Sequence, residues 1–290
     1  MECGGGVTVS AVEILLAAAS ALVYGTGDFF GGLASRRVAS IVVTAVSQFV
    51  GLALLLVVAP LWPHPHVSAT DWWWGGAGGL FGAIGLSMFF TALSRGAMAA
   101  VAPTTALVSA VVPVVVGVIG GDRPQMVAWI GVVLAFPAIA LVAGGLSAAA
   151  TRISASTLAL SIGAGLGFGS FFAAFSQTHH GAGMVPLLAA RLASATLLGV
   201  VLVIRGRSIE VGAPHRRLVV ASGLFDVSAN GLYLLAVSRG MLSTVAVVAA
   251  MYPASTVVLA RVVLGERLAK WQQLGLALAA ASVTMVALGR

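Results

Sequence analysis

Charged residues are scarce in this chain. They make up 8% of its 290 residues, whereas hydrophobic residues make up 60% and the mean hydropathy is +1.08. About a quarter of the residues of an ordinary water-soluble domain are charged, so the composition excludes that class. The apolar stretches are neither one-faced nor alternating, which excludes in-plane amphipathic helices and β-barrels. The sequence predicts an all-α integral membrane protein.

Cysteine is nearly absent, since Cys3 is the single one. This excludes disulfide frameworks and thiolate metal sites. Five histidines are present but have no acidic or cysteine partners at the spacing of metal ligands: they are His64, His66, His179, His180 and His215. We therefore expect neither a metal site nor a cofactor.

Two further kinds of site are missing. The net charge is +7 and the pI is about 11.0, but no basic stripe with interleaved aromatics occurs, so we expect no nucleic-acid partner. The stretch "GAGLGFG" is not a nucleotide-binding loop, because no strand precedes it and no acidic residue follows at the required spacing. The 36 glycines instead suit close approach of helices in lipid.

Long apolar runs are present throughout. A bilayer core needs about 20 apolar residues per helix, and the charges, prolines and glycine-polar clusters divide the chain into ten such segments. The first is taken as a span and not as a secretory signal, because it lacks a basic start and is too long. The predicted spans are 11–33, 38–60, 72–92, 98–119, 125–144, 156–176, 183–204, 216–237, 242–263 and 269–288.

The chain contains an internal repeat. A shift of 144 residues aligns 92–145 with 236–289 without a gap, and 18 of the 54 positions are identical. The matches include a Ser-Arg-Gly triplet and a Gly-Asp/Glu-Arg triplet, which apolar composition alone does not produce. The sequence predicts a first repeat at 11–144, a linker at 145–155 and a second repeat at 156–290.

Each repeat has five spans, an odd number, so the second must enter the membrane in the opposite sense to the first. The charges agree, because the loops after the odd-numbered spans carry eleven basic residues and the other side carries three. The eleven are Arg36, Arg37, Arg95, Arg152, Arg205, Arg207, Arg216, Arg217, Arg261, Arg267 and Lys270, and the three are Arg123, Arg239 and Arg290. This bias places the termini outside the cell.

The two repeats and the motif "P…LGERL…QxxGxxL" at 253–278 resemble the EamA-type transporters of the drug/metabolite transporter superfamily. The first copy departs from the motif, with Asp122 where Glu is usual and Pro124 after Arg123. The resemblance implies a ten-helix secondary transporter with a central cavity between inverted bundles. It also implies a small-molecule substrate, ranging over amino acids, other metabolites and drugs. The family is generally described with cytoplasmic termini, so the orientation stays open.

Asp226 and Arg191 lie deep in predicted spans. An ionised Asp at the centre of a helix costs about 2.5–3.5 kcal/mol on insertion scales, so it needs a partner or a polar cavity. Both residues lie at similar depths in consecutive antiparallel spans, which predicts that they meet. Two interpretations remain: the pair fixes helix packing, or one member faces the cavity and binds a charged group or a proton.

Other polar and aromatic residues are candidates for the same cavity, because matching positions of inverted halves build central sites. Each also has a plainer interpretation as a packing residue, and Asp28 as one that reaches the headgroups. On the first repeat the candidates are Tyr24, Thr26, Asp28 and Gln48, and on the second they are Phe168, Ser170, Asn230, Tyr233 and Tyr252. Asn230 lies one turn from Asp226, hence on the same face.

The loop motif is interpreted as structural. Glu266, between spans 9 and 10, can accept hydrogen bonds from the amides that open span 10. Its companions are Asp122, Gly265 and Arg267. Prolines within spans predict kinks that are either static or hinges: Pro103, Pro113, Pro137 and Pro253.

Together these features predict a secondary transporter of the cell membrane. We expect an exporter of small metabolites or drugs that works by alternating access, with proton coupling or uncoupled facilitation as its two modes. An integral membrane enzyme would need convergent catalytic side chains near an interface, and the sequence has none. A scaffold that does not transport would not need Asp226 and Arg191 deep in the bilayer.

Overall fold

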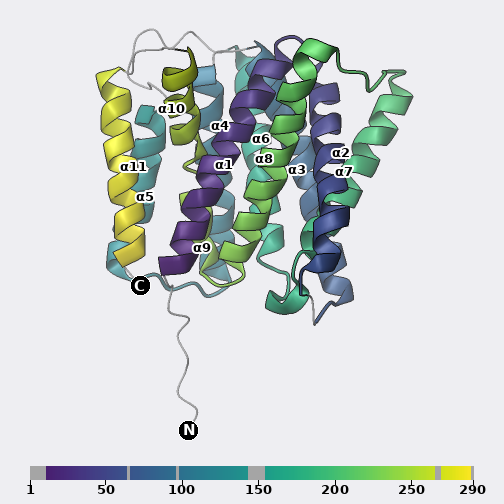
Figure 1. The fold of residues 1–290 in the computed structure, drawn as a ribbon. Helices are drawn as coiled ribbons and strands as arrows, with labels where there is room; N and C mark the ends of the chain where they lie inside the picture. Colours follow the sequence, from purple (N-terminus) through teal and green to yellow (C-terminus); the bar gives the residue numbers. More distant parts are fainter. Residues whose placement is uncertain (1–10, 64–65, 96–97, 143–153, 265–268, 289–290) are drawn as a thin grey trace.

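The computed structural model describes residues 11–63, 66–95, 98–142, 154–264 and 269–288, and all regular structure in them is helical. The helices run side by side in one bundle (Figure 1). In chain order they are α1 (Ala11–Ser35), α2 (Ser40–Val58), η1 (Ala59–Leu61), α3 (Ala69–Arg95), α4 (Met98–Ile119), α5 (Met126–Val142), α6 (Ala155–Phe175), η2 (His180–Ala182), α7 (Val185–Ile204), α8 (Ala213–Val237), α9 (Leu242–Ala249), α10 (Tyr252–Leu264) and α11 (Lys270–Leu288).

All ten predicted spans fall on helices. Within the described ranges, six helices are long and apolar enough to cross a membrane on their own, and shorter apolar helices accompany them. The predicted linker at 145–155 lies almost entirely outside the described residues. The chain is therefore a multi-pass integral membrane protein.

The ninth span, predicted over 242–263 with a kink at Pro253, is not one continuous helix. It is divided into α9, which ends at Ala249, and α10, which begins at Tyr252. Pro253 is the second residue of α10 and has no N–H, so it cannot continue the helical ladder to the carbonyl of Ala249. The matching span of the first repeat, α4, is continuous. The break is thus a feature of the second repeat alone.

The helix contacts follow a twofold relation between the repeats. α1 packs on α8 and α10, and the matching helix α6 packs on α3 and α4. α2 packs on α8, and its match α7 packs on α3. The pairs α2–α7 and α5–α11 each join matching helices, and they lie at opposite ends of the bundle (Figure 1). When each helix is replaced by its match in the other repeat, every contact of this set becomes a contact of the same set.

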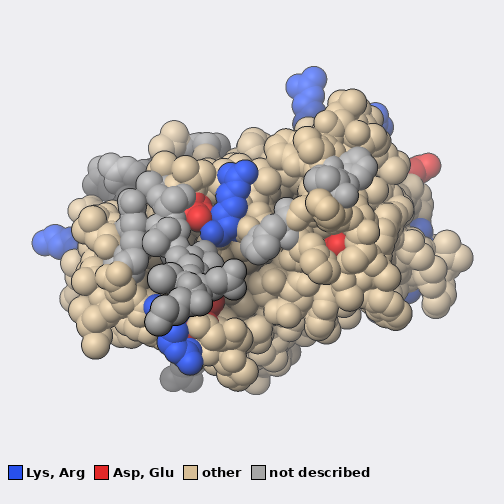
Figure 2. Space-filling model, turned by 90° about the horizontal axis from the view of Figure 1, so that it is seen from below, with Lys and Arg blue, Asp and Glu red and all other residues tan. Residues whose placement is uncertain are grey.

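The repeats are inverted. The start of α1 and the end of α11 lie at the same face of the bundle (Figure 1), as an even number of crossings requires. Figure 2 views this face, which uncharged residues largely cover. The opposite face carries eight described basic residues in its loops and helix ends: Arg36, Arg37, Arg95, Arg205, Arg207, Arg216, Arg217 and Lys270. The side chain of Arg261 and all of Arg152 and Arg267 lie outside the described residues.

Glycines allow close helix crossings at equivalent places in the two repeats. A Cβ atom at Gly79 of α3 would lie 2.6 Å from the carbonyl carbon of Ala190 on α7. At the equivalent Gly223 of α8, a Cβ atom would lie 2.9 Å from the Cα atom of Ser47 on α2. Neither crossing has room for a side chain. The two contacts hold α2, α3, α7 and α8 around the centre of the bundle.

Candidate functional site

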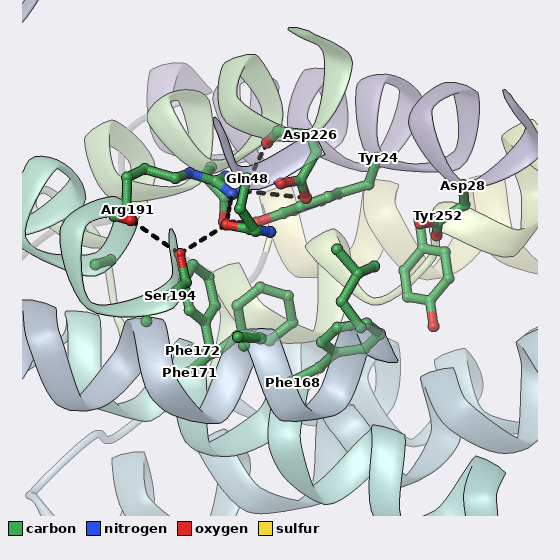
Figure 3. A pocket seen from close by; sticks show the side chains of 16 residues that line it. Tyr24, Asp28, Gln48, Phe168, Phe171, Phe172, Arg191, Ser194, Asp226 and Tyr252 are labelled. Carbon is green, nitrogen blue, oxygen red and sulfur yellow. Dashed lines mark hydrogen bonds and ion pairs between the residues drawn. The ribbon is translucent and has the colours of Figure 1, made fainter. Parts of the chain in front are cut away.

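A cavity lies between the two repeats, midway along the spans. Its polar lining comes from α1, α2, α7, α8 and α10, and its apolar lining comes mainly from α3 and α6 (Figure 3). The free volume is about 50 Å³. The cavity is therefore narrow in this conformation.

An ion pair crosses one end of the cavity. The Nη2 atom of Arg191 lies 2.7 Å from Oδ2 of Asp226, and the two side chains are 5% and 18% exposed. The depths of the two residues predicted this meeting, but the assumed hairpin packing of their helices is wrong. α2 packs against both α7 and α8, which make few contacts with each other. Gly51 of α2 leaves the space that the guanidinium needs, since a Cβ there would lie 3.3 Å from Nε.

Gln48 of α2 holds the arginine from the other side. Its Oε1 atom accepts hydrogen bonds from Nη1 of Arg191 and from the hydroxyl of Ser194, the latter at 2.9 Å. Arg191 and Ser194 lie three residues apart on one face of α7. The guanidinium is therefore bound by a carboxylate and an amide, and only its buried Nε has no partner among the described residues.

A second set of hydrogen bonds extends the ion pair to α1. The Tyr24 hydroxyl donates to Oδ1 of Asn230 at 2.7 Å. The amide nitrogen of Asn230 donates to the backbone oxygen of Asp226 at 2.6 Å and to its Oδ1 at 3.3 Å. A continuous polar network thus runs from α1 through α8 to α7 and α2. Such networks gain strength in a low-dielectric interior when their members are satisfied.

Two further polar groups stand apart from this network. Asp28 lies one turn beyond Tyr24 on α1 and lines the cavity, so it does not reach the headgroups. No hydrogen bond or ion pair joins its carboxylate to another described residue. The hydroxyl of Tyr252 is likewise without a partner in the described part of the chain, although Tyr252 is only 3% exposed. Figure 3 shows both at the end of the cavity away from Arg191.

The wall opposite these groups is aromatic. It consists of Phe168, Phe171 and Phe172 of α6, together with small and aliphatic residues of α3. The ring of Phe172 makes an edge contact with Tyr24, with the centroids 6.0 Å apart. Phe171 and Phe172 were not among the predicted residues. The internal repeat could have identified Phe172 as a lining residue, because Phe172 occupies the position equivalent to Asp28.

Three predicted residues lie outside the cavity lining. Thr26 donates to the carbonyl of Leu22 in its own helix at 2.8 Å. It lies two positions from Tyr24 and two positions from Asp28 in the sequence, which places it on the opposite face of α1. Ser170 does not line the cavity either. Tyr233 is fully buried and donates to the backbone oxygen of Phe172 at 3.1 Å, so it supports the aromatic wall from behind.

Asp122 of the loop motif contacts the other repeat. Asp122 does not cap the helix that follows it. Its Oδ2 atom accepts a hydrogen bond from the backbone N–H of Ser243 at 2.8 Å and so caps α9, in the other repeat. Gly265, Glu266 and Arg267 lie outside the described residues.

Comparisons with known proteins agree with this architecture. The model of the EamA-like transporter family matches the chain twice, over 11–144 and over 155–288. One solved crystal structure of a protein is similar over 96% of this chain and 97% of its own, with a TM-score of 0.77 and 16% sequence identity. That likeness shows the fold. No curated protein matches. Because the family model covers most of the sequence in two copies, the chain belongs to the EamA-like transporter family, a family of transporters and not of enzymes.

Proposed function

We propose that this chain is a secondary transporter of the cell membrane that exports small metabolites or drugs by alternating access of two repeats, 11–144 and 156–290. One observation carries the proposal: Asp28, Arg191 and Asp226 all line one cavity between the repeats. Ionisable side chains within membranes are rare and mark the paths of substrates and ions. Inverted repeats place such sites at their interface, near the bilayer midplane.

The small size of the cavity supports alternating access. With about 50 Å³ free, the cavity is narrow, and a substrate larger than this space enters only after helices separate. The break between α9 and α10 lies at the cavity wall, because Tyr252 opens α10 and lines the cavity. Broken helices of this kind supply transporters with bending points and backbone groups at the site.

A proton is the proposed source of energy. One charge moved through 100 mV releases about 2.3 kcal/mol. Arg191 already neutralises Asp226, whereas Asp28 has no basic partner among the described residues. Asp28 is therefore the better proton carrier of the two carboxylates.

The substrate is found by a screen. A strain that overexpresses the chain is compared with an empty-vector strain for resistance to toxic compounds and for metabolites released into the medium. We expect at least one compound to be exported by the expressing strain alone. Equal resistance and equal release in both strains would contradict the proposal of an exporter.

Coupling is tested with purified protein in vesicles that contain a pH-sensitive dye. Addition of the compound found by the screen should move protons, and Asp28→Asn should stop this movement. The matched control is Thr26→Val, on the same helix but outside the cavity lining, which should behave as the wild type. Substrate movement without proton movement would identify uncoupled facilitation.

A further inference from the structure

The two walls of the central cavity occupy equivalent positions of the two repeats but differ completely in chemistry. A shift of 144 residues relates Tyr24 to Phe168 and Asp28 to Phe172. The same shift relates Gly82 to Asp226 and Leu86 to Asn230, and all eight residues line the cavity. Every polar member of these pairs lies on α1 or α8, and every apolar member lies on α3 or α6 (Figure 3). The occupant therefore meets a polar wall on one side and an apolar wall on the other.

The charges of the cavity do not cancel. Arg191 and Asp226 neutralise each other at 2.7 Å. Among the described residues, the titratable groups near Asp28 are Asp226 of α8, Tyr252 of α10 and Tyr24 of its own helix, and none of these three is a base. When Asp28 is ionised, the lining has a net charge of −1. An uncompensated charge in a low-dielectric site is unfavourable, so the occupant of the site has to neutralise it.

From these two features we propose that the cavity takes an amphipathic organic cation with one positive charge and a flat apolar part, in exchange for the proton on Asp28. The inference rests on the proposed transport function. The cationic group lies at Asp28, beside the ring of Tyr252 (Figure 3). The apolar part lies against Phe168 and Phe172. An anion would raise the net charge of the occupied site to −2, and a neutral compound would leave Asp28 uncompensated.

The exchange has a defined stoichiometry. On one side of the membrane the cation binds and the Asp28 carboxyl releases its proton. On the other side the cation leaves and the carboxylate takes up a proton. One positive charge crosses in each direction, and the Arg191–Asp226 pair stays neutral throughout. Transport is therefore electroneutral, driven by a pH gradient and insensitive to the membrane potential.

The test uses the full chain in vesicles and three probes that share one ring system: N-methylquinolinium (+1), quinoline (0) and quinoline-2-carboxylate (−1). Protons are followed with an internal dye, and protein-free vesicles report leakage. The potential is set with potassium and valinomycin. We expect proton release with N-methylquinolinium and with neither of the other probes. The ratio of N-methylquinolinium concentrations across the membrane should be the same at 0 and 100 mV. Movement of one net charge would change that ratio about 50-fold, since 100 mV corresponds to about 2.3 kcal/mol.

Variants link these results to the site. Asp28→Asn should abolish exchange of N-methylquinolinium and Asp28→Glu should retain it, while Thr26→Val serves as the matched control. Size-exclusion chromatography checks that each variant is folded. If Asp28→Asn does not fold, Asp28→Glu still tests the site. The substrate class is overturned if N-methylquinolinium does not move, if another probe moves as fast, or if the ratio follows the potential. Export of a neutral or anionic compound in the strain screen, with proton movement, would overturn the class and leave the transport function standing.

Discussion

The Nη2 atom of Arg191 lies 2.7 Å from the Oδ2 atom of Asp226, although α7 and α8 make few contacts with each other. α2 lies against both helices, and the guanidinium passes beside Gly51 to reach the carboxylate. The ion pair therefore joins α7 to α8 within the second repeat, and α2 of the first repeat lies beside it. Its position also decides which carboxylate of the cavity is left without a base, namely Asp28.

Removal of one member of the pair should be worse than removal of both. Arg191→Ala leaves the Asp226 carboxylate buried without its partner, which destabilises proteins by about 3–5 kcal/mol. The double variant Arg191→Ala/Asp226→Ala removes that charge. We expect the unfolding midpoint in detergent to be lowest for Arg191→Ala and partly restored in the double variant. A double variant less stable than Arg191→Ala would contradict this account.

Gln48 should matter more than Ser194. Ser194→Ala removes one hydrogen bond, worth about 1 kcal/mol. Gln48→Leu leaves the Arg191 Nη1 group without its acceptor, and an unsatisfied buried group costs about 1–3 kcal/mol, more when it is charged. The Ser194 hydroxyl keeps the backbone oxygen of Arg191 as an acceptor at 3.2 Å. Thermal unfolding in detergent should rank the variants in that order. Thr284→Ala, which removes an exposed hydrogen bond of α11, is the control and should have no measurable effect.

The crossing of α3 and α7 should not tolerate a methyl group at Gly79. A Cβ atom there would lie 2.6 Å from the carbonyl carbon of Ala190, so Gly79→Ala should lower the unfolding midpoint and the yield of folded protein. Gly76, three residues earlier on α3, is the matched position. A Cβ at Gly76 would meet only the Cβ of Ala193 at 4.0 Å, and alanine favours a helix by up to about 1 kcal/mol over glycine. Equal effects at both positions would show that the crossing is looser than described.

Asp122 should protect the first turn of α9. Its carboxylate accepts the N–H of Ser243, and loss of a capping side chain costs about 0.5–2 kcal/mol. Hydrogen exchange measured by mass spectrometry should be faster at the start of α9 in Asp122→Ala. Asp122→Asn keeps an acceptor oxygen, so its exchange should stay close to that of the wild type. Faster exchange confined to α5 would instead favour a cap on the following helix.

Much of the fold follows from the sequence because hydropathy and internal repetition act along the chain. The apolar runs predicted the ten spans, and an odd number of spans per repeat predicted their inversion. The ninth span was predicted with a kink at Pro253, and the structure divides it beside that proline into α9 and α10. A proline is tolerated near the start of a helix as well as at a kink, and the residues around Pro253 do not distinguish the two.

The site was predictable in part. The penalty for ionisable groups in lipid selected Asp28, Arg191 and Asp226, and all three line the cavity. Thr26 was included among the candidate cavity residues because it lies between Tyr24 and Asp28 in the sequence. Ser170 was included because it is the repeat equivalent of Thr26. The helical period of α1 already places Thr26 on the face away from Tyr24, so this error was avoidable.

The sequence by itself determined that the chain spans a membrane as two inverted copies of five spans, because composition, hydropathy and repetition are properties of order along the chain. Only the tertiary structure decided that Gln48 and Gly51 accommodate Arg191, that Asp122 caps a helix of the other repeat, and that polar and aromatic walls face each other. These are contacts between residues far apart in the chain. The packing of helices in three dimensions selects such contacts, and local patterns do not encode it.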